Sequence, residues 1–193
     1  SQLGEDCIGA ADPAVDFRGF AGIGMVFTHD ECCWGGSRTT NLDGVRRTWG
    51  VVYMTVDADH LIWAHEIGHG FGFYHASGNG REYNDPWSVM GLSACFGDAD
   101  PVIGCIGQYP AADQLAVGLD WVPSDRIVTV TSGQSQLISL ERLASPATPN
   151  PQLVRIPIQG SQSRYYTAEA RQRIGFDANL PDDAIVVHLV DLE

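Results

Sequence analysis

The eleven residues from His65 to His75 carry the clearest chemistry in the chain, and they read H-E-I-G-H-G-F-G-F-Y-H. His65 and His69 are four positions apart, so on a helix their rings share one face about one turn apart and can hold one metal ion. Glu66, between them, can reach a water at that metal. Gly72 is expected to end the helix, because glycine adopts a left-handed backbone at little cost, and the turn would bring His75 back as a third ligand.

Three histidines and a water make a tetrahedral zinc site with an open position, which is the catalytic arrangement. The sequence therefore predicts one Zn²⁺ ion bound by His65, His69 and His75, with Glu66 as the general base. The alternative is a helix whose histidines are simply satisfied within the fold. Chance matches to H-E-x-x-H do occur, but the added glycine and third histidine make them roughly several hundred-fold rarer at average residue usage. The pattern favours zinc.

These residues resemble the metzincin metallopeptidases, whose pattern is H-E-x-x-H-x-x-G-x-x-H followed by a methionine turn. A candidate for that turn is W-S-V-M-G at Trp87–Gly91, downstream of His75. The longer block Glu82–Gly91 looks like the gametolysin-like family and is also similar to the bacterial immune-inhibitor-A-like peptidases. For Met90 the resemblance implies an apolar floor beneath the histidines and no role as a ligand.

The resemblance implies a secreted zinc-dependent endopeptidase that hydrolyses peptide bonds of extracellular proteins. Zinc would make a water acidic enough to lose its proton near neutral pH, and Glu66 would accept that proton and pass it to the leaving amine. Two alternatives stay open: a catalytically inactive zinc-binding or adhesion module of the same fold, and a zinc hydrolase that acts on a non-peptide bond. The presence of Glu66 argues against the inactive module, which would be free to lose it.

Composition restricts the partners of the chain. Its 193 residues carry a formal net charge of −13, and all 11 basic residues are arginine. An acidic chain with no basic cluster is a poor partner for nucleic acid or an anionic membrane, and no apolar run reaches the roughly 18 residues that span a bilayer. We expect a monomer that acts on a protein or peptide substrate, with no nucleic acid partner and no membrane span.

Cysteine usage bears on the compartment. The five cysteines are Cys7, Cys32, Cys33, Cys95 and Cys105, and none has the C-x-x-C spacing of a structural zinc site. In an oxidising compartment Cys95 and Cys105 would form a local bridge. Cys7 would pair with Cys32 or Cys33 and leave one thiol over. Free buried cysteines in a reducing compartment are the alternative, but the loop positions favour disulfides.

The expected architecture is an α+β fold of the metzincin-like zincin type, with a twisted mixed sheet, the active-site helix and a lower subdomain that carries the methionine turn. The catalytic domain is expected at residues 1–122, with the upper subdomain reaching about residue 75 and the lower subdomain at 76–122. Beyond it the composition changes to short β-branched runs, so a small, truncated all-β module is expected at 123–193.

The first half of the chain alternates apolar runs with polar, glycine-rich segments. We expect strands at 19–28 and 46–56, and irregular chain at 1–16 and 29–44. The active-site helix should run from about residue 59 to 70. Its cap is either Asp57 or Asp59, because an acidic side chain at a helix N-terminus accepts backbone hydrogen bonds and complements the dipole. His60 is expected to be no ligand, since the tetrahedral set is already complete.

The second half is predicted to contain one helix and several strands. Residues 110–119 have a helical pattern, with proline in the first turn. The apolar runs that predict strands are 126–131, 136–140, 153–158, 165–170 and 184–190. Asp98 and Asp100 raise the question of calcium, but no twelve-residue ligand pattern accompanies them, so an ordinary acidic loop is favoured.

Overall fold

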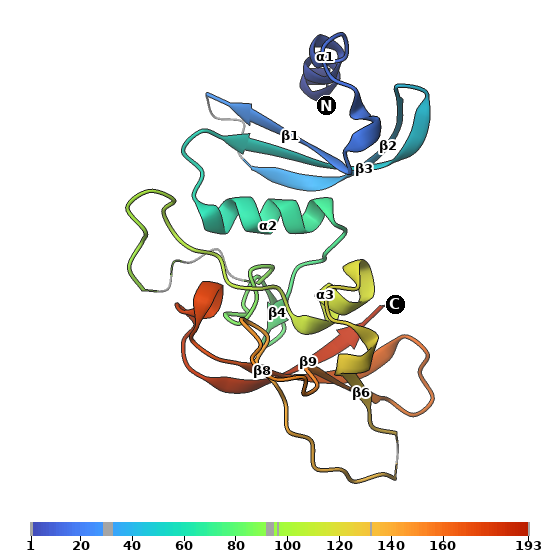
Figure 1. Cartoon of the computed structure of the whole chain (residues 1–193), viewed down its shortest axis with the longest axis vertical. Coiled ribbons are helices and arrows are strands. Elements are labelled where there is room, and N and C mark those ends of the chain that lie inside the picture. Colours follow the sequence, from blue (N-terminus) through green and yellow to red (C-terminus); the bar gives the residue numbers. More distant parts are fainter. Residues whose placement is uncertain (1, 29–32, 92–94, 96, 132, 193) are drawn as a thin grey trace. The chain divides into compact units, whose positions relative to one another are not determined.

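The computed structural model describes residues 2–28, 33–91, 95, 97–131 and 133–192. The chain divides into two compact units, Ser1–Tyr74 and His75–Glu193 (Figure 1). Three helices and three sheets are found among the described residues, so the predicted α+β class is confirmed. Within that part of the chain, no helix is long and apolar enough to cross a membrane.

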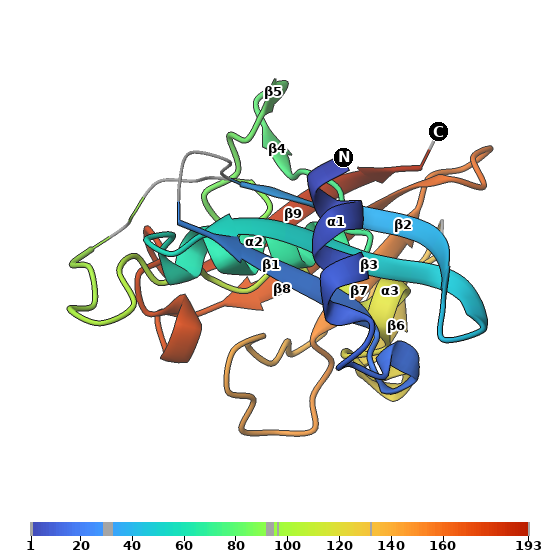
Figure 2. The same cartoon turned by 90° about the horizontal axis from the view of Figure 1, so that it is seen from above.

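The first unit is a three-stranded mixed sheet with a helix on each face (Figures 1 and 2). The central strand β3 (Val45–Thr55) pairs in parallel with β1 (Gly22–Phe27) and antiparallel with β2 (Trp34–Leu42). Helices α1 (Gln2–Ala11) and α2 (His60–Gly70) lie on opposite faces of this sheet. The mixed sheet and helix α2 are the coarse features that the sequence predicted.

Side-chain alternation along β3 explains why both faces are covered. Trp49 and Val51 point to the α1 face, where they join a buried apolar cluster with Ile8 of α1. The rest of that cluster is Phe17, Met25 and Leu42. On the other face, Val52 and Met54 are buried beneath α2. A strand that is apolar on both sides needs a cover on both sides.

Glycines allow α2 to lie unusually close to the sheet. A Cβ at Gly50 of β3 would lie 2.7 Å from the carbonyl oxygen of Gly70, and a Cβ at Gly35 of β2 would overlap the carbonyl of Glu66. No residue with a side chain fits at either position unless the helix moves. The sheet therefore fixes the backbone of the helical turn that carries Glu66.

Two expectations for the first half are wrong. Residues 1–16 are not all irregular, because α1 occupies Gln2–Ala11 and buries Gly4 and Ile8, four positions apart on one helical face. Residues 29–44 are not a loop in their described part, because β2 forms a ladder with β3. The backbone of Asp43 and Gly44 has positive φ at both positions, as a two-residue hairpin turn requires. Residues 29–32 lie outside the described part of the chain.

The second unit is organised by a four-stranded sheet in the order β6-β7-β8-β9. The strands of this sheet are β6 (Ile127–Thr129), β7 (Leu153–Pro157), β8 (Arg164–Arg171) and β9 (Ala184–Asp191). They are preceded in the chain by a short hairpin of β4 (Ser77–Gly78) and β5 (Arg81–Glu82) and by helix α3 (Ala112–Leu119). Single-turn 3₁₀ helices occur at Phe17–Gly19 in the first unit and at Ser124–Arg126 and Gly175–Asp177 in the second. Strand β6 is parallel to β7, and the remaining pairs are antiparallel.

The predicted helix at 110–119 and four of the five predicted strands match observed elements of the second unit. The exception is the run at 136–140, which forms no strand. Leu137 in this run is 98% exposed, so its alternating pattern faces no core. Periodicity predicts a half-buried strand only where another layer covers one side.

Three fully buried charged side chains form one network inside the second unit. Arg171 donates to Asp177 at 2.7 and 2.9 Å and to Glu169 at 3.0 Å. The same guanidinium donates to the carbonyl oxygens of Trp87 and Tyr109. Burial alone would lower the pKa of Arg171, but the two carboxylates outweigh it and raise that pKa, so the guanidinium stays charged. A buried cation with every donor directed at an oxygen fixes the loops around it.

Helix α3 is attached to the sheet by a second polar group. Asp113 accepts hydrogen bonds from Arg155 at 3.1 Å and from the Tyr165 hydroxyl at 2.9 Å. Burial, and then the neighbouring Asp113 charge, raise the pKa of Tyr165 to about 12. These contacts, like those of Arg171, cross residue 122. The predicted boundary between a domain at 1–122 and a module at 123–193 stays a prediction.

The cysteines follow the prediction in part. Cys95 and Cys105 form the predicted disulfide. Cys7 is a free thiol, so its predicted pairing with Cys32 or Cys33 is wrong. The physical reason is that Cys7 lies on α1, where it packs against the apolar cluster of the first unit. Cys33 is disulfide-bonded, and Cys32 lies outside the described residues.

His188 of β9 forms an ion pair with Asp85 in the loop after β5. The His188 Nε2 donates to the Asp85 carboxylate at 2.9 Å, and the other oxygen of this carboxylate accepts the backbone N–H of Trp87 at 2.9 Å. Burial lowers the pKa of His188, but the hydrogen bond to Asp85 and the negative charges of Glu169 and Asp85 outweigh it, so that the pKa is raised above 6.5 despite the opposing charge of Arg171. The charged pair holds the loop that contains Trp87 against the sheet.

We expect Gly35→Ala to destabilise the fold by about 3 kcal/mol, because an added methyl group forces a well-packed helix away from its sheet. Urea unfolding measures the change. Gly9→Ala is the matched control, since a Cβ at Gly9 meets nothing within 4 Å. An alanine variant at Gly35 that is as stable as the wild type would show that the close approach does not constrain the helix.

We expect the His188–Asp85 pair to stabilise the protein below pH 6.5 and to lose this effect as pH rises through the folded-state pKa of His188. Folding raises the pKa of His188, so the folded state binds the proton more tightly than the unfolded state does, and protonation stabilises the fold. The measurement is the midpoint of thermal unfolding of wild type and His188→Gln from pH 5.5 to 8.5. Their difference should shrink with rising pH; a constant difference contradicts the assignment.

Candidate metal centre

Helix α2 begins at a defined cap. Asp59 has an extended backbone, and its carboxylate accepts the N–H of Ile62 at 3.1 Å. Of the two predicted caps, Asp57 and Asp59, the structure therefore selects Asp59, and the helix runs from His60 to Gly70 close to its predicted bounds. This start sets which residues of the following motif share a face of the helix.

The end of α2 is a left-handed turn at Gly72, as predicted. Gly72 has φ +88°, and its N–H donates to the His69 carbonyl at 2.9 Å. The next N–H, of Phe73, reaches back to the Gly68 carbonyl at 2.9 Å. These two bonds form a Schellman motif, which satisfies helix carbonyls that otherwise have no partner. The turn also buries the Phe73 side chain and directs the chain towards His75.

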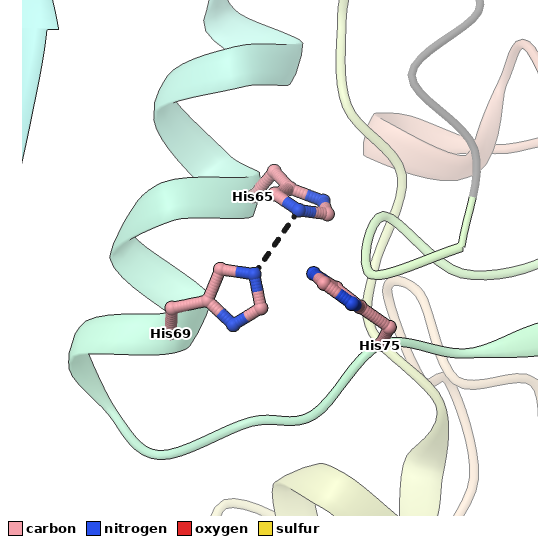
Figure 3. A group of neighbouring side chains, drawn as sticks. All are labelled: His65, His69 and His75. Atoms are coloured by element: carbon pink, nitrogen blue, oxygen red, sulfur yellow. Dashed lines mark hydrogen bonds between the residues drawn. The ribbon is translucent and has the colours of Figure 1, made fainter. Parts of the chain in front are cut away.

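The three predicted ligands come together. The ring nitrogens of His65, His69 and His75 lie within 4.8 Å of one another, and this is the one group of three or more potential ligands found among the described residues. Figure 3 shows two rings projecting from one side of α2 and the third facing them from the segment beyond the turn. The Nε2 atoms of His65 and His69 are 3.2 Å apart. Two nitrogens on a tetrahedral zinc ion are separated by about 3.3 Å, given Zn–N bonds of about 2.05 Å.

Hydrogen bonds fix the tautomers of two of these rings. The Nδ1 of His69 lies 2.8 Å from the Phe73 carbonyl oxygen, which only accepts, so Nδ1 carries a proton and, in the neutral ring, Nε2 is the nitrogen with the free lone pair. The Nδ1 of His75 lies 2.6 Å from the Glu82 carboxylate, which also only accepts, so in the neutral ring Nε2 has the lone pair that can bind a metal. Neutral imidazoles with an anchored second nitrogen are what zinc binding requires. The residues present therefore fit a zinc ion.

Glu66 and His60 have different places on α2. Glu66 is half-buried and adjoins His65 in the sequence of the helix, so its position suits the predicted general base, which stays a prediction. His60 is the first residue of the helix and is not a member of the three-histidine group.

Met90 lies in the predicted turn and is completely buried. Its N–H donates to the Ser88 hydroxyl at 3.2 Å, and Gly91 N–H returns to the Ser88 carbonyl at 2.9 Å, which closes a tight turn. The Met90 carbonyl accepts the N–H of Ala76 at 2.9 Å. The methionine turn therefore holds the backbone next to the third histidine.

Sequence reasoning missed Glu82 and Tyr83. The Tyr83 ring lies 4.0 Å from the His75 ring between centroids. The available signal was Asn79-Gly80, a dipeptide typical of two-residue hairpin turns, and both residues have positive φ in the hairpin β4–β5. The hairpin reverses the chain and returns Glu82 to the histidine.

Asp98 and Asp100 are not part of a candidate calcium site, because no cluster of three or more carboxylates is found among the described residues. The Asp100 carboxylate accepts the N–H groups of Val102 and Ile103 at 2.8 and 3.1 Å, which lower its pKa. One of its oxygens is thus used in shaping a turn. Calcium stays without support.

Comparisons with known proteins provide no family assignment for this geometry. No protein-family model, no curated protein and no solved structure matches the chain. The arrangement of His65, His69 and His75, together with the residues that contact them, is the feature of the chain that indicates a function.

Proposed function

We propose that the chain is a secreted zinc-dependent endopeptidase that hydrolyses peptide bonds of extracellular proteins. The observation that carries the proposal is the convergence of three histidine ring nitrogens within 4.8 Å, two of them on one helix beside Glu66. Three histidines leave one position of a tetrahedral zinc ion open, as in catalytic sites, whereas structural sites use four protein ligands.

The metzincin-like zincin fold belongs to the same proposal. It is supported by the left-handed turn at Gly72 that follows α2, by the return of the chain to His75 and by the buried turn at Met90. Met90 would form the apolar floor of the site. The gametolysin-like assignment rests on the sequence block that contains this turn, and secretion is supported by the disulfide between Cys95 and Cys105.

In the proposed mechanism, His65, His69 and His75 would hold the zinc ion through one ring nitrogen each. When bound, zinc supplies a Lewis acid that polarises the scissile carbonyl and makes a water acidic enough to lose its proton near neutral pH. Glu66 accepts the proton of the attacking water and delivers it to the leaving amine, so that one carboxylate acts first as base and then as acid. The bond from the carbonyl carbon to the water oxygen forms first, and the bond from that carbon to the nitrogen then breaks as the amine receives the proton.

We expect the purified protein to bind one zinc ion per chain and His65→Ala to lose it, because two histidines do not complete the set. Elemental analysis measures the stoichiometry. Added zinc should also raise the unfolding temperature of the metal-stripped wild type, since a ligand that binds only the folded state stabilises it. His60→Ala is the matched control on the same helix and should bind zinc normally. A wild type without zinc contradicts the site itself.

We expect Glu66→Ala to lower the rate of casein cleavage at least about 100-fold while zinc remains bound, because it removes the general base and no ligand. A chelator should abolish wild-type cleavage. Equal rates for wild type and variant would show that the mechanism is wrong. Chelator-sensitive hydrolysis of esters or amides without protein cleavage would indicate a non-peptide hydrolase, and zinc binding without any turnover would indicate an inactive module.

A further inference from the structure

The third histidine differs from the other two in how it is supported. His65 and His69 belong to α2, whose backbone hydrogen bonds and packing fix them. His75 follows the helix, and 24% of its side chain is exposed. An imidazole on a non-helical segment needs other contacts to keep its ring in place.

Two consecutive residues of the second unit provide those contacts. The Glu82 carboxylate accepts the His75 Nδ1 proton at 2.6 Å. The Tyr83 ring lies against the same imidazole, with centroids 4.0 Å apart and planes inclined at 46°. Tyr83 has φ +60°, an uncommon conformation for a bulky residue that persists only where the surroundings impose it.

The hairpin β4–β5 determines why these two residues reach the histidine. Asn79 and Gly80 form its two-residue turn, and Ser77 pairs with Glu82. The Asn84 side chain then donates to the Gly78 carbonyl at 3.3 Å and ties the chain after the hairpin to its first strand. The hairpin is only two residues long on each side, so it places Glu82 directly opposite the chain that leaves His75.

We propose that Glu82 is a positioning residue for the third zinc ligand and that Tyr83 supports it. This inference rests on the proposed function. Glu82 keeps the proton on Nδ1 of His75, orients the ring and makes Nε2 a stronger electron-pair donor to the metal. The Tyr83 ring restricts rotation of the imidazole. The hairpin from Ser77 to Glu82 is thus the device that completes the metal centre.

The test measures metal binding directly, in the full chain, by competition with a chromophoric chelator for zinc. Glu82→Ala should raise the zinc dissociation constant about 10- to 100-fold, as loss of a hydrogen-bonded partner of a ligand does. Glu82→Gln should fall between wild type and Glu82→Ala, because an amide oxygen still accepts the Nδ1 proton but carries no charge. Asp98→Asn is the matched control: it removes one exposed negative charge from the same unit and should bind zinc as the wild type does.

A spectroscopic readout separates positioning from a general loss of stability. The absorption bands of the cobalt-substituted protein report ligand geometry, and they should change in Glu82→Ala and return towards wild type in Glu82→Gln. Tyr83→Asn removes the ring but tolerates the left-handed backbone, and it should shift the bands in the same direction as Glu82→Ala. If wild type binds zinc and cleaves protein while Glu82→Ala keeps its affinity and spectrum, the inference is wrong and the proposed function stands. If wild type binds no zinc, both fail.

Discussion

The C-terminal turn of α2 is the constraint on which the candidate metal centre depends. The left-handed backbone of Gly72 lets the next N–H group return to the Gly68 carbonyl, so the chain leaves the helix in one direction only. The same turn brings the Phe73 carbonyl within 2.8 Å of His69 Nδ1. A single glycine thus ends the helix, places the hydrogen-bond partner of His69 Nδ1 and starts the segment that leads to His75. A residue with a Cβ here would act on all three at once.

The second unit applies a different kind of constraint, because its interior contains charges. Arg171 directs its donors at Glu169, Asp177 and two loop carbonyls, including that of Trp87 before Met90. Buried ion pairs contribute little to net stability, since desolvation offsets most of the attraction. Any arrangement that separates the partners is nevertheless strongly unfavourable, because it leaves a buried charge without a partner. We therefore interpret this network as a device that specifies where the methionine turn lies relative to the sheet of its own unit.

The parts of the structure that followed from the sequence are those determined by neighbouring residues. The cap of α2, its stop at Gly72 and the spacing of its histidines all depend on contacts within about four residues. Strand β2 was missed because a glycine such as Gly35, considered without its neighbours in space, is typical of turns. Gly35 is needed in the strand because the carbonyl of Glu66, distant in the sequence, lies where a Cβ would be. Glu82 was missed because it reaches His75 only through the hairpin that Asn79 and Gly80 close, and no residue spacing within the eleven-residue motif indicates that contact. The assignment of Cys7 failed similarly, since its packing on α1 depends on the sheet.

This difference between local and distant determinants also explains how the three histidines of the candidate metal centre are arranged. Two of them inherit their separation from the helix, so four residues of spacing suffice to place their Nε2 atoms 3.2 Å apart. The position of His75 depends on the turn at Gly72, on the bond between Ala76 and the Met90 carbonyl and on the Glu82 carboxylate. Only the first of these belongs to the eleven-residue motif. A chain that kept the motif but lost the hairpin and the turn at Met90 would keep two of the histidines in place and leave the third without orientation.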